Sequence, residues 1–196
     1  MKQVISNASL DFFPMKRFFF LSLFALNMLA TGIAYAEKAD ADKPTNVEAN
    51  QMAYDDVRQV NTFTGDVVLT RGTLIMKAHK MVVTQDPAGY QFATLHAGQG
   101  KPASFRQKRD GGANLWIEGE AERIEYDNKA DVAKLFSKAK MRRLEGTKVT
   151  DEVEGEFISY DNRTEFFAVN NTSSDSSKPG AGRVKAVIQP RNEAKK

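Results

Sequence analysis

Apolar and polar residues alternate along most of this chain, and the alternation is clearest from Thr62 to Leu74. The odd-numbered positions from Phe63 to Leu69 are apolar or small there, and the even-numbered positions are mostly polar. A period of two predicts a β-strand with one buried face. Arg71-Gly72 then predicts a turn into a second strand.

Similar short strands follow one another between turn signals such as Asp86-Pro87-Ala88-Gly89 and Arg109-Asp110-Gly111-Gly112. After Ala49 the parity of the apolar positions changes, which predicts a bulge or a bend where the strand passes from one sheet to another. Beyond residue 36, no segment of ten or more residues keeps a helical period. The sequence therefore predicts an all-β fold of antiparallel strands, in a sandwich or a roll.

One phrase, small-x-x-apolar-x-Tyr-Asp, recurs at Ala49–Asp55, Ala121–Asp127 and Gly155–Asp161, with a degenerate copy at Ala78–Thr84. A hairpin unit repeated about every 30 residues can bury a face that one hairpin cannot bury alone. The aspartates of the phrase are expected to be turn residues whose side chains accept hydrogen bonds from the local backbone.

Residues 1–36 are predicted to be a signal peptide, and residues 1–14 are a possible upstream extension of it. Met15-Lys16-Arg17 is positively charged, Phe18–Ala30 is apolar, and Ala34-Tyr35-Ala36 fits the cleavage rule. The apolar run is shorter than the roughly 20 residues of a membrane span. Translation could begin at Met1 or Met15, and the mature chain is expected to begin at Glu37.

Charge and composition narrow the class of protein. The totals of 28 Lys+Arg and 25 Asp+Glu become 25 and 24 without residues 1–36, which removes Lys2, Lys16, Arg17 and Asp11. A balance this close to neutral gives no argument for nucleic acid binding. The chain has no cysteine, so an exported protein of this sequence is held by its strands and core rather than by disulfides. We expect one domain over 45–190, with a disordered lead-in at 37–44, a flexible linker at 170–182 and a charged tail at 191–196.

Candidate catalytic chemistry is sparse. His79 and His96 are the only histidines, and most carboxylates fall at turns. We expect no catalytic residues, no metal site and no cofactor, so the chain is not predicted to be an enzyme.

Three features together resemble the LptA/OstA-like family of periplasmic lipopolysaccharide-transport bridge proteins. They are Phe63-Thr64-Gly65-Asp66-Val67, Gly100-Lys101-Pro102-Ala103-Ser104-Phe105 and the spaced Tyr-Asp turns, and the resemblance covers about 45–190. It implies a periplasmic location and a twisted β-jellyroll, a V-shaped roll open along one side, with an apolar groove that carries the acyl chains of lipid A. Its implied partners are further copies of the chain, an inner-membrane-anchored jellyroll of an ATP-driven export complex, and an outer-membrane translocon. The Ser-rich linker at 172–182 departs from the family pattern.

The alternating apolar positions are expected to point inward and line this groove, with an ordinary packed core as the alternative. Several are methionines, which adapt to irregular apolar ligands, and the tyrosines add hydroxyls beside an apolar lining. The predicted lining residues are Val47, Met52, Tyr54, Phe63, Val67, Leu69, Leu74, Met76, Met81, Val83, Phe105, Ile117, Ile124, Tyr126, Leu135, Met141, Ile158, Tyr160 and Phe167.

The first and last strands are expected to leave open edges, which soluble proteins usually protect with charge or proline. The resemblance implies head-to-tail strand addition between copies through these edges, and an ordinary solvated edge is the alternative. The predicted edge-pairing residues are Thr45, Val47, Ala49, Val184, Ala186 and Ile188.

Lys77, Arg106 and Arg142 lie opposite the apolar face or at strand ends, and are expected to add little to lipid binding because exposed charges are screened. The alternative function is a periplasmic carbohydrate-binding or cell-wall module on a β-sandwich. A module of this kind needs an exposed aromatic platform for sugars, and Trp116 is the candidate for it.

Overall fold

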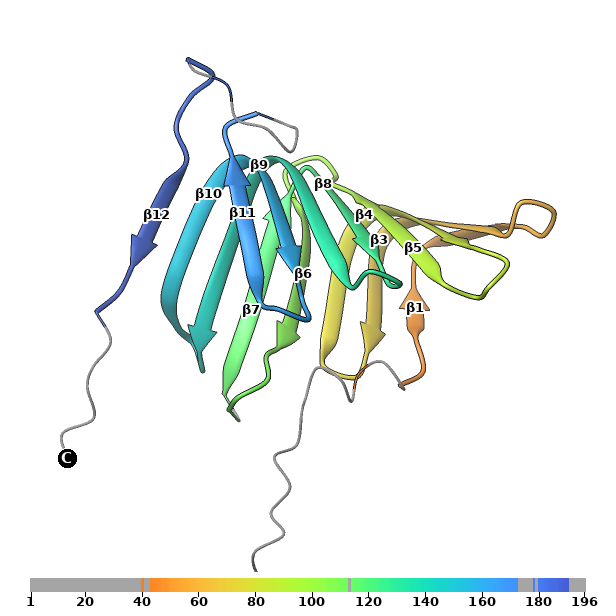
Figure 1. Cartoon of the computed structure of the whole chain (residues 1–196). Helices are drawn as coiled ribbons and strands as arrows, with labels where there is room; N and C mark the ends of the chain where they lie inside the picture. Colours follow the sequence, from red (N-terminus) through yellow and green to blue (C-terminus); the bar gives the residue numbers. More distant parts are fainter. Residues whose placement is uncertain (1–39, 41–42, 113, 173–177, 179, 191–196) are drawn as a thin grey trace, which may run out of the picture. The chain divides into compact units, whose positions relative to one another are not determined.

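Figure 1 shows the computed structural model of the chain, which describes residues 40, 43–112, 114–172, 178 and 180–190. The predicted signal peptide, the charged tail and most of the lead-in lie outside the described residues. The strands all belong to one compact unit, Ala34–Lys196.

Within the described residues the chain forms one twelve-stranded sheet in which every pairing is antiparallel. This confirms the predicted all-β fold. The strands are β1 (Asn46–Glu48), β2 (Gln51–Asp55), β3 (Val60–Arg71), β4 (Leu74–Gln85), β5 (Gln91–His96), β6 (Ala103–Lys108), β7 (Leu115–Ala121), β8 (Arg123–Asp127), β9 (Val132–Glu145), β10 (Lys148–Asp161), β11 (Phe166–Asn170) and β12 (Lys185–Ile188).

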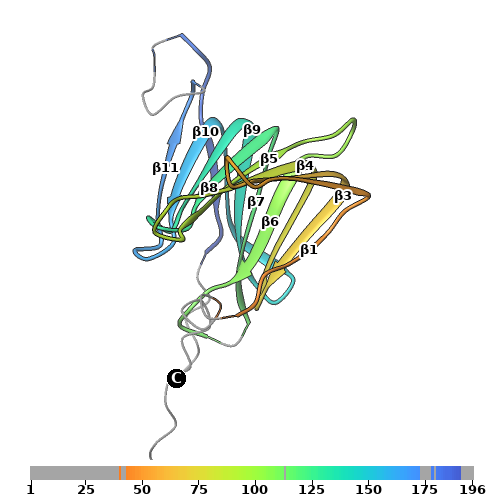
Figure 2. The ribbon, with the colours of Figure 1, turned by 90° about the vertical axis from the view of Figure 1, so that its right-hand side faces the viewer.

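Four long strands, β3, β4, β9 and β10, each take part in two half-sheets. One half of each strand pairs within the order β2-β3-β4-β5-β8-β9-β10-β11, which we call half-sheet A. The other half pairs within the order β1-β3-β4-β6-β7-β9-β10-β12, which we call half-sheet B. Figure 2 shows the long strands running from one half-sheet into the other.

The long strands change direction at local irregularities of the ladder. In β3 the register shifts between Thr64 and Val67, and Gly65 and Asp66 have positive φ angles of 83° and 46°. In β9, Ser137 and Lys138 have positive φ angles of 62° and 52°. Extra residues of this kind bend a strand and increase its twist. We call this line of bends the corner.

Backbone hydrogen bonds continue across the corner. The Asn50 amide donates to the Gly65 carbonyl (3.0 Å), the Ala97 amide to the Glu122 carbonyl (2.8 Å), and the Glu122 amide to the Ser137 carbonyl (3.0 Å). The bend predicted after Ala49 is confirmed, because β1 and β2 pair with different halves of β3.

The repeated phrase forms equivalent hairpin turns. Asp55 accepts a hydrogen bond from the Arg58 amide (3.0 Å), as the sequence predicts. Asp127 and Asp161 likewise accept bonds from amides two and three residues further along. Asp86, after the degenerate copy, accepts bonds from the Ala88 and Tyr90 amides, two and four residues further along. All four turns lie at the end of half-sheet A that is remote from the corner, because each closes a hairpin of that half-sheet.

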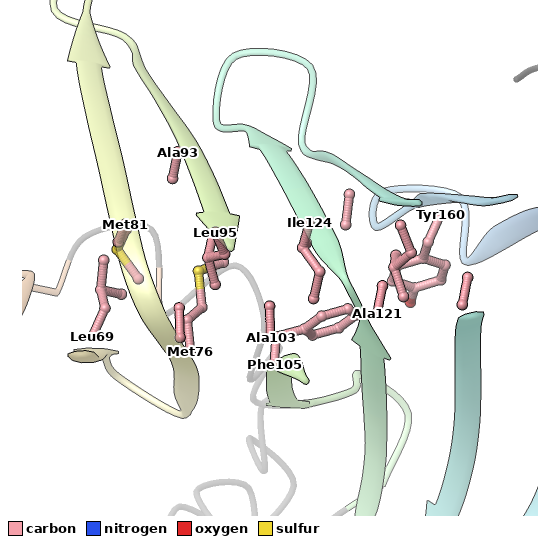
Figure 3. Close-up of a cluster of buried hydrophobic side chains, with 14 of the residues drawn as sticks. Leu69, Met76, Met81, Ala93, Leu95, Ala103, Phe105, Ala121, Ile124 and Tyr160 are labelled. Carbon is pink, nitrogen blue, oxygen red and sulfur yellow. The ribbon is translucent and has the colours of Figure 1, made fainter. Parts of the chain in front are cut away.

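The inward faces of the two half-sheets share one hydrophobic cluster. Figure 3 shows part of it, with Met81 and Leu95 from half-sheet A lying among Leu69 and Met76 from half-sheet B. The half-sheets approach closely at Gly119. A Cβ atom there would lie 2.2 Å from a ring carbon of Phe105 and 3.0 Å from Leu135.

We predict that Gly119→Ala lowers the free energy of unfolding by about 1–3 kcal/mol, because an added methyl group overpacks the interior. Urea denaturation would measure this. Phe105→Leu removes the ring carbons that the new methyl group meets, so the double variant should lose less than the sum of the two single losses. Strictly additive losses would show that the clash is not the cause.

Candidate functional site

The candidate site is the interior between the half-sheets, together with the two ends of the strands that face each other far from the corner. We call these ends lip A, formed by the hairpin turns of half-sheet A, and lip B, formed by the strand ends and turns of half-sheet B near Arg71, Arg109 and Arg143. Hydrogen bonds between the lips, described below, close the interior on this side.

Most predicted lining residues are buried in this interior. Those less than a tenth exposed are Phe63, Val67, Leu69, Leu74, Met76, Met81, Phe105, Ile117, Ile124, Leu135, Met141, Ile158 and Tyr160. Val47, Val83, Tyr126 and Phe167 are half-buried and pack against the same cluster.

Met52 and Tyr54 are a correction to the expected inward placement, because their side chains are 61% and 53% exposed. Met52 pairs with Phe63 and shares its side of the sheet. Both residues lie on β2, which pairs only with β3 among the described strands, so no neighbour beyond β2 covers them. The Tyr54 hydroxyl bonds to Asp56 (2.9 Å) and Gln59 (3.2 Å) in the adjoining turn.

The interior is packed rather than hollow. Residues of both half-sheets, including Leu69, Met76 and Ala93, line a cavity of about 30 Å³ beside Arg71 and Tyr126. A cavity of about 10–15 Å³ is enough to hold one water molecule, so this one has room for about two. An acyl chain can enter here only if side chains or the half-sheets move apart.

Arg71 of lip B reaches across to lip A. Its guanidinium donates to the Asn128 side chain (3.3 Å) and to the Tyr126 hydroxyl (3.2 Å), and it lies 5.9 Å from the centre of the Tyr126 ring. The Tyr126 hydroxyl in turn donates to Asp131 (2.8 Å), which also accepts weaker bonds from Asn162. The network therefore joins lip B to two neighbouring turns of lip A.

Arg109 and Arg143 make the second connection, and both contact Glu165. The Arg109 guanidinium forms an ion pair with the Glu165 carboxylate, and Arg143 donates to the Glu165 carbonyl (2.8 Å). Arg143 also lies 5.1 Å from the centre of the Phe167 ring. Glu165 has a positive φ of 52°, and so does Asp131 at 56°. Such a conformation costs a non-glycine residue about 1–2 kcal/mol, so these contacts hold strained turns in place.

Burial is the main cause that raises the pKa of Tyr126 above its ordinary value of 10.0, and the nearby Asp131 carboxylate raises it further. The phenol is therefore neutral at physiological pH. A neutral phenol can accept from Arg71 and donate to Asp131 at once, so it relays the contact from lip B to the turn.

The outward face of half-sheet B carries the basic residues that the sequence singled out. Arg106 forms an ion pair with Glu118, and Arg142 bonds to Glu120 (3.1 Å) and Glu152 (2.8 Å). Lys77 lies on the same face, beside Arg106 and Arg142 around a shallow pocket. Trp116 is half-buried, and the Arg106 guanidinium lies 4.4 Å from the centre of its ring, so one ring face is covered.

The described residues offer no metal site, since they contain no group of three or more His, Asp or Glu side chains placed to hold an ion. His96 is partly buried, and burial followed by the positive charge of Lys80 lowers its pKa. His79 packs its Cβ against Gly98 at the corner.

Across the part of the chain that the structure covers, no helix is long and apolar enough to cross a membrane.

β1 and β12 are edge strands of half-sheet B. Of the predicted edge-pairing residues, Val47, Ala186 and Ile188 lie in these strands, whereas Thr45, Ala49 and Val184 lie just outside them. In the linker before β12, the Asn171 side chain bonds to the backbone of Lys178 and Gly182. Residues 173–177 and 179 lie outside the described residues.

The family model described as LptA/(LptD N-terminal domain) LPS transport protein matches residues 46–166, which extend from the start of β1 to the first residue of β11. The chain belongs to this family. The resemblance drawn from the sequence is thereby confirmed.

Individual relatives agree with the family match. The lipopolysaccharide export system protein LptA of Escherichia coli K12 is 35% identical over 137 residues, covering 69% of this chain and 70% of the relative. The LptA protein of Haemophilus influenzae is 28% identical over 166 residues, covering 85% and 88%. A crystal structure of LptH, the LptA-homologous periplasmic component of the lipopolysaccharide transport device from Pseudomonas aeruginosa, matches with a TM-score of 0.66 and 26% identity. That match covers 77% of this chain and 99% of the LptH chain.

The segment that matches the LptA family contains both lips, whereas β12 lies beyond it.

Sequence reasoning assigned Arg71 and Arg109 to turns and missed their contacts across the interior. A signal was present, because Arg71 continues the inward parity of Leu69 and Arg143 continues that of Met141. Charged residues that extend an inward row to the end of a strand are candidates for contacts at the rim.

Asp40 is an exception within the lead-in that the sequence predicts to be disordered. Its side chain is 3% exposed and accepts bonds from the Thr73 amide (2.8 Å) and hydroxyl (2.5 Å). It also lies 3.5 Å from the Gln107 amide nitrogen. No local pattern marks a single anchoring residue of this kind, since its partners are distant in sequence.

We predict that Tyr126 keeps its proton in the folded protein at about pH 10, where an ordinary tyrosine is half ionised, because burial and the Asp131 carboxylate raise its pKa. Phenolate absorbance of the folded chain and of Tyr126→Phe should therefore coincide up to about pH 10. When both chains are unfolded in urea, their phenolate absorbances should differ near pH 10, because Tyr126 then ionises as an ordinary tyrosine does. The folded state holds this proton more tightly than the unfolded chain, so the contribution of Tyr126 to stability declines as the pH rises above about 10. A difference in absorbance near pH 10 under native conditions would contradict the prediction.

Proposed function

We propose that this protein carries lipopolysaccharide through the periplasm, holding acyl chains of lipid A between its half-sheets. One observation carries the proposal: a member of the LPS transport family encloses a continuous apolar interior between two half-sheets. In the described residues these half-sheets are joined by backbone hydrogen bonds at the corner and by side chains at the lips. The names of the E. coli and P. aeruginosa relatives, which refer to lipopolysaccharide export and transport, support it.

Binding needs no covalent chemistry. Each Å² of apolar acyl surface that leaves water contributes about 25 cal/mol. Met76, Met81 and Met141 line the interior and can change rotamers to fit an irregular chain. Direction would come from outside the protein, from an ATP-driven complex with an inner-membrane-anchored jellyroll, and delivery would be to an outer-membrane translocon.

We further propose that copies assemble head to tail through β1 and β12. Among the described strands β1 pairs only with β3 and β12 only with β10, so each has one edge free to accept another strand. A contact between two different edges does not close on itself and extends the half-sheets from copy to copy.

The carbohydrate-binding alternative is less well supported. A sugar platform needs a flat aromatic ring open to solvent, and the ring of Trp116 is covered on one face by Arg106.

A photo-crosslinking amino acid at Phe105 should capture lipopolysaccharide in cells, since this side chain is 6% exposed and faces the interior. The neighbouring Arg106 faces outward and is the matched control. Tyr126 gives a second inward position near the rim, and Glu125 is its outward control. Capture from Arg106 and Glu125 alone would refute binding in the interior.

Ile188→Pro should weaken concentration-dependent association by at least about tenfold while the monomer stays folded. The Gln189 amide donates to the Thr150 carbonyl of β10, and amides alternate in direction along a strand, so the Ile188 amide points to the free edge. Sedimentation velocity over a range of concentrations measures the effect. Ile188→Ala keeps the amide and should associate almost normally. Unchanged association of the proline variant would refute edge pairing.

A further inference from the structure

The three arginines that join the lips hold unused hydrogen-bond donors. The Nε–H groups of Arg71, Arg109 and Arg143 are buried and have no hydrogen-bond partner among the described residues. A guanidinium offers five N–H donors in a planar fork, and a buried donor without a partner destabilises the structure that holds it. These groups would therefore be better satisfied by a ligand with several acceptor oxygens than by their present partners.

Charge at the rim favours an anionic ligand. Among the contacts described above, the guanidinium of Arg109 pairs with a carboxylate, that of Glu165. Arg71 contacts only the neutral side chains of Tyr126 and Asn128 there, and Arg143 contacts a backbone carbonyl. The guanidinium fork also matches phosphate, which it binds through two parallel hydrogen bonds.

The location suits an amphiphile. The arginines stand where the apolar interior meets solvent, and Arg71 borders the 30 Å³ cavity. The corner cannot open without breaking the backbone ladder, whereas the lips are joined here by side chains. An acyl chain that enters from the side must pass between the lips, and its head group then lies beside the arginines.

We propose that Arg71, Arg109 and Arg143 form the phosphate-binding site for the head group of an entering phosphorylated lipid, and that phosphate replaces Glu165 and the Tyr126–Asn128 pair as their partner. This exchange breaks the contacts of the three arginines with lip A, which we call the latch, and so frees the two lips to move apart. The inference rests on the proposed function, because it assumes that acyl chains enter the interior.

The exchange should affect the rate of lipid loading more than the equilibrium affinity. Phosphate gains contacts with the arginines while Glu165, Tyr126 and Asn128 lose theirs, so the net effect on equilibrium affinity is small. The rate of loading responds more strongly, because the latch must open before the acyl chains can be buried. Because the Glu165 carboxylate can take the place of the phosphate again, such a site also allows the lipid to leave.

The test compares the loading rates of bisphosphorylated lipid A and of the same lipid after removal of its phosphates. Capture by a photo-crosslinking amino acid at Phe105 gives the readout in the full mature chain. We expect wild type to load the phosphorylated lipid about tenfold faster or more, and the ratio to fall towards one in Arg109→Gln/Arg143→Gln.

Two further variants make this comparison specific. Arg106→Gln/Arg142→Gln removes the same charge from the outward face, so its ratio should equal that of wild type. Glu165→Gln keeps the arginines but weakens their internal partner, so it should load the phosphorylated lipid faster than wild type. The proposal is overturned if the Arg109/Arg143 variant keeps the wild-type ratio, or if Glu165→Gln loads more slowly.

A second measurement follows the lips directly. The chain has no cysteine, so spin labels on Gly112→Cys and Thr164→Cys report one distance between lip B and lip A. Double electron–electron resonance should show that this distance becomes longer when bisphosphorylated lipid A binds. An unchanged distance in the loaded protein overturns the unlatching. Failure of wild type to load either lipid would instead refute the proposed function itself.

Discussion

The continuity of backbone hydrogen bonds through the corner is the constraint on which the rest of the structure depends. Because β3, β4, β9 and β10 serve both half-sheets, the two layers cannot slide or separate independently on that side. The ladder keeps its bonds at the bends through positive φ angles at residues such as Gly65 and Ser137. The opposite side has no such backbone connection in the described residues, so side chains decide how firmly it is closed.

This asymmetry gives the two kinds of charged contact different consequences. The ion pairs on the outward face, such as Lys140 with Glu154 at 2.6 Å, cross neighbouring strands of one half-sheet. The two side chains of this pair are 27% and 33% exposed, and ion pairs that remain open to water add little to stability. The contacts of Arg109 and Arg143 with Glu165 join different half-sheets and are better shielded, since the Arg109 side chain is only 14% exposed. Similar residues therefore link neighbouring strands of one half-sheet in one place and join the two half-sheets in the other.

Much of the architecture could be predicted from the sequence because period-two alternation reports burial directly. Phe63, Leu69 and Ile117 are buried as the pattern indicates. The same pattern failed for Met52 and Tyr54, because parity gives the face of a strand but not whether another strand covers it. The contacts of Arg71 and Arg109 could not be predicted either, since they join residues more than fifty positions apart that only the fold brings together.

The repeated hairpin has a consequence for how such a protein can grow. Each Tyr-Asp hairpin lies in half-sheet A, and its long strand continues into half-sheet B. Duplicating such a hairpin within the gene would therefore lengthen both half-sheets and the interior between them. The stacking of separate copies that we propose above would lengthen the same interior without any change to the chain.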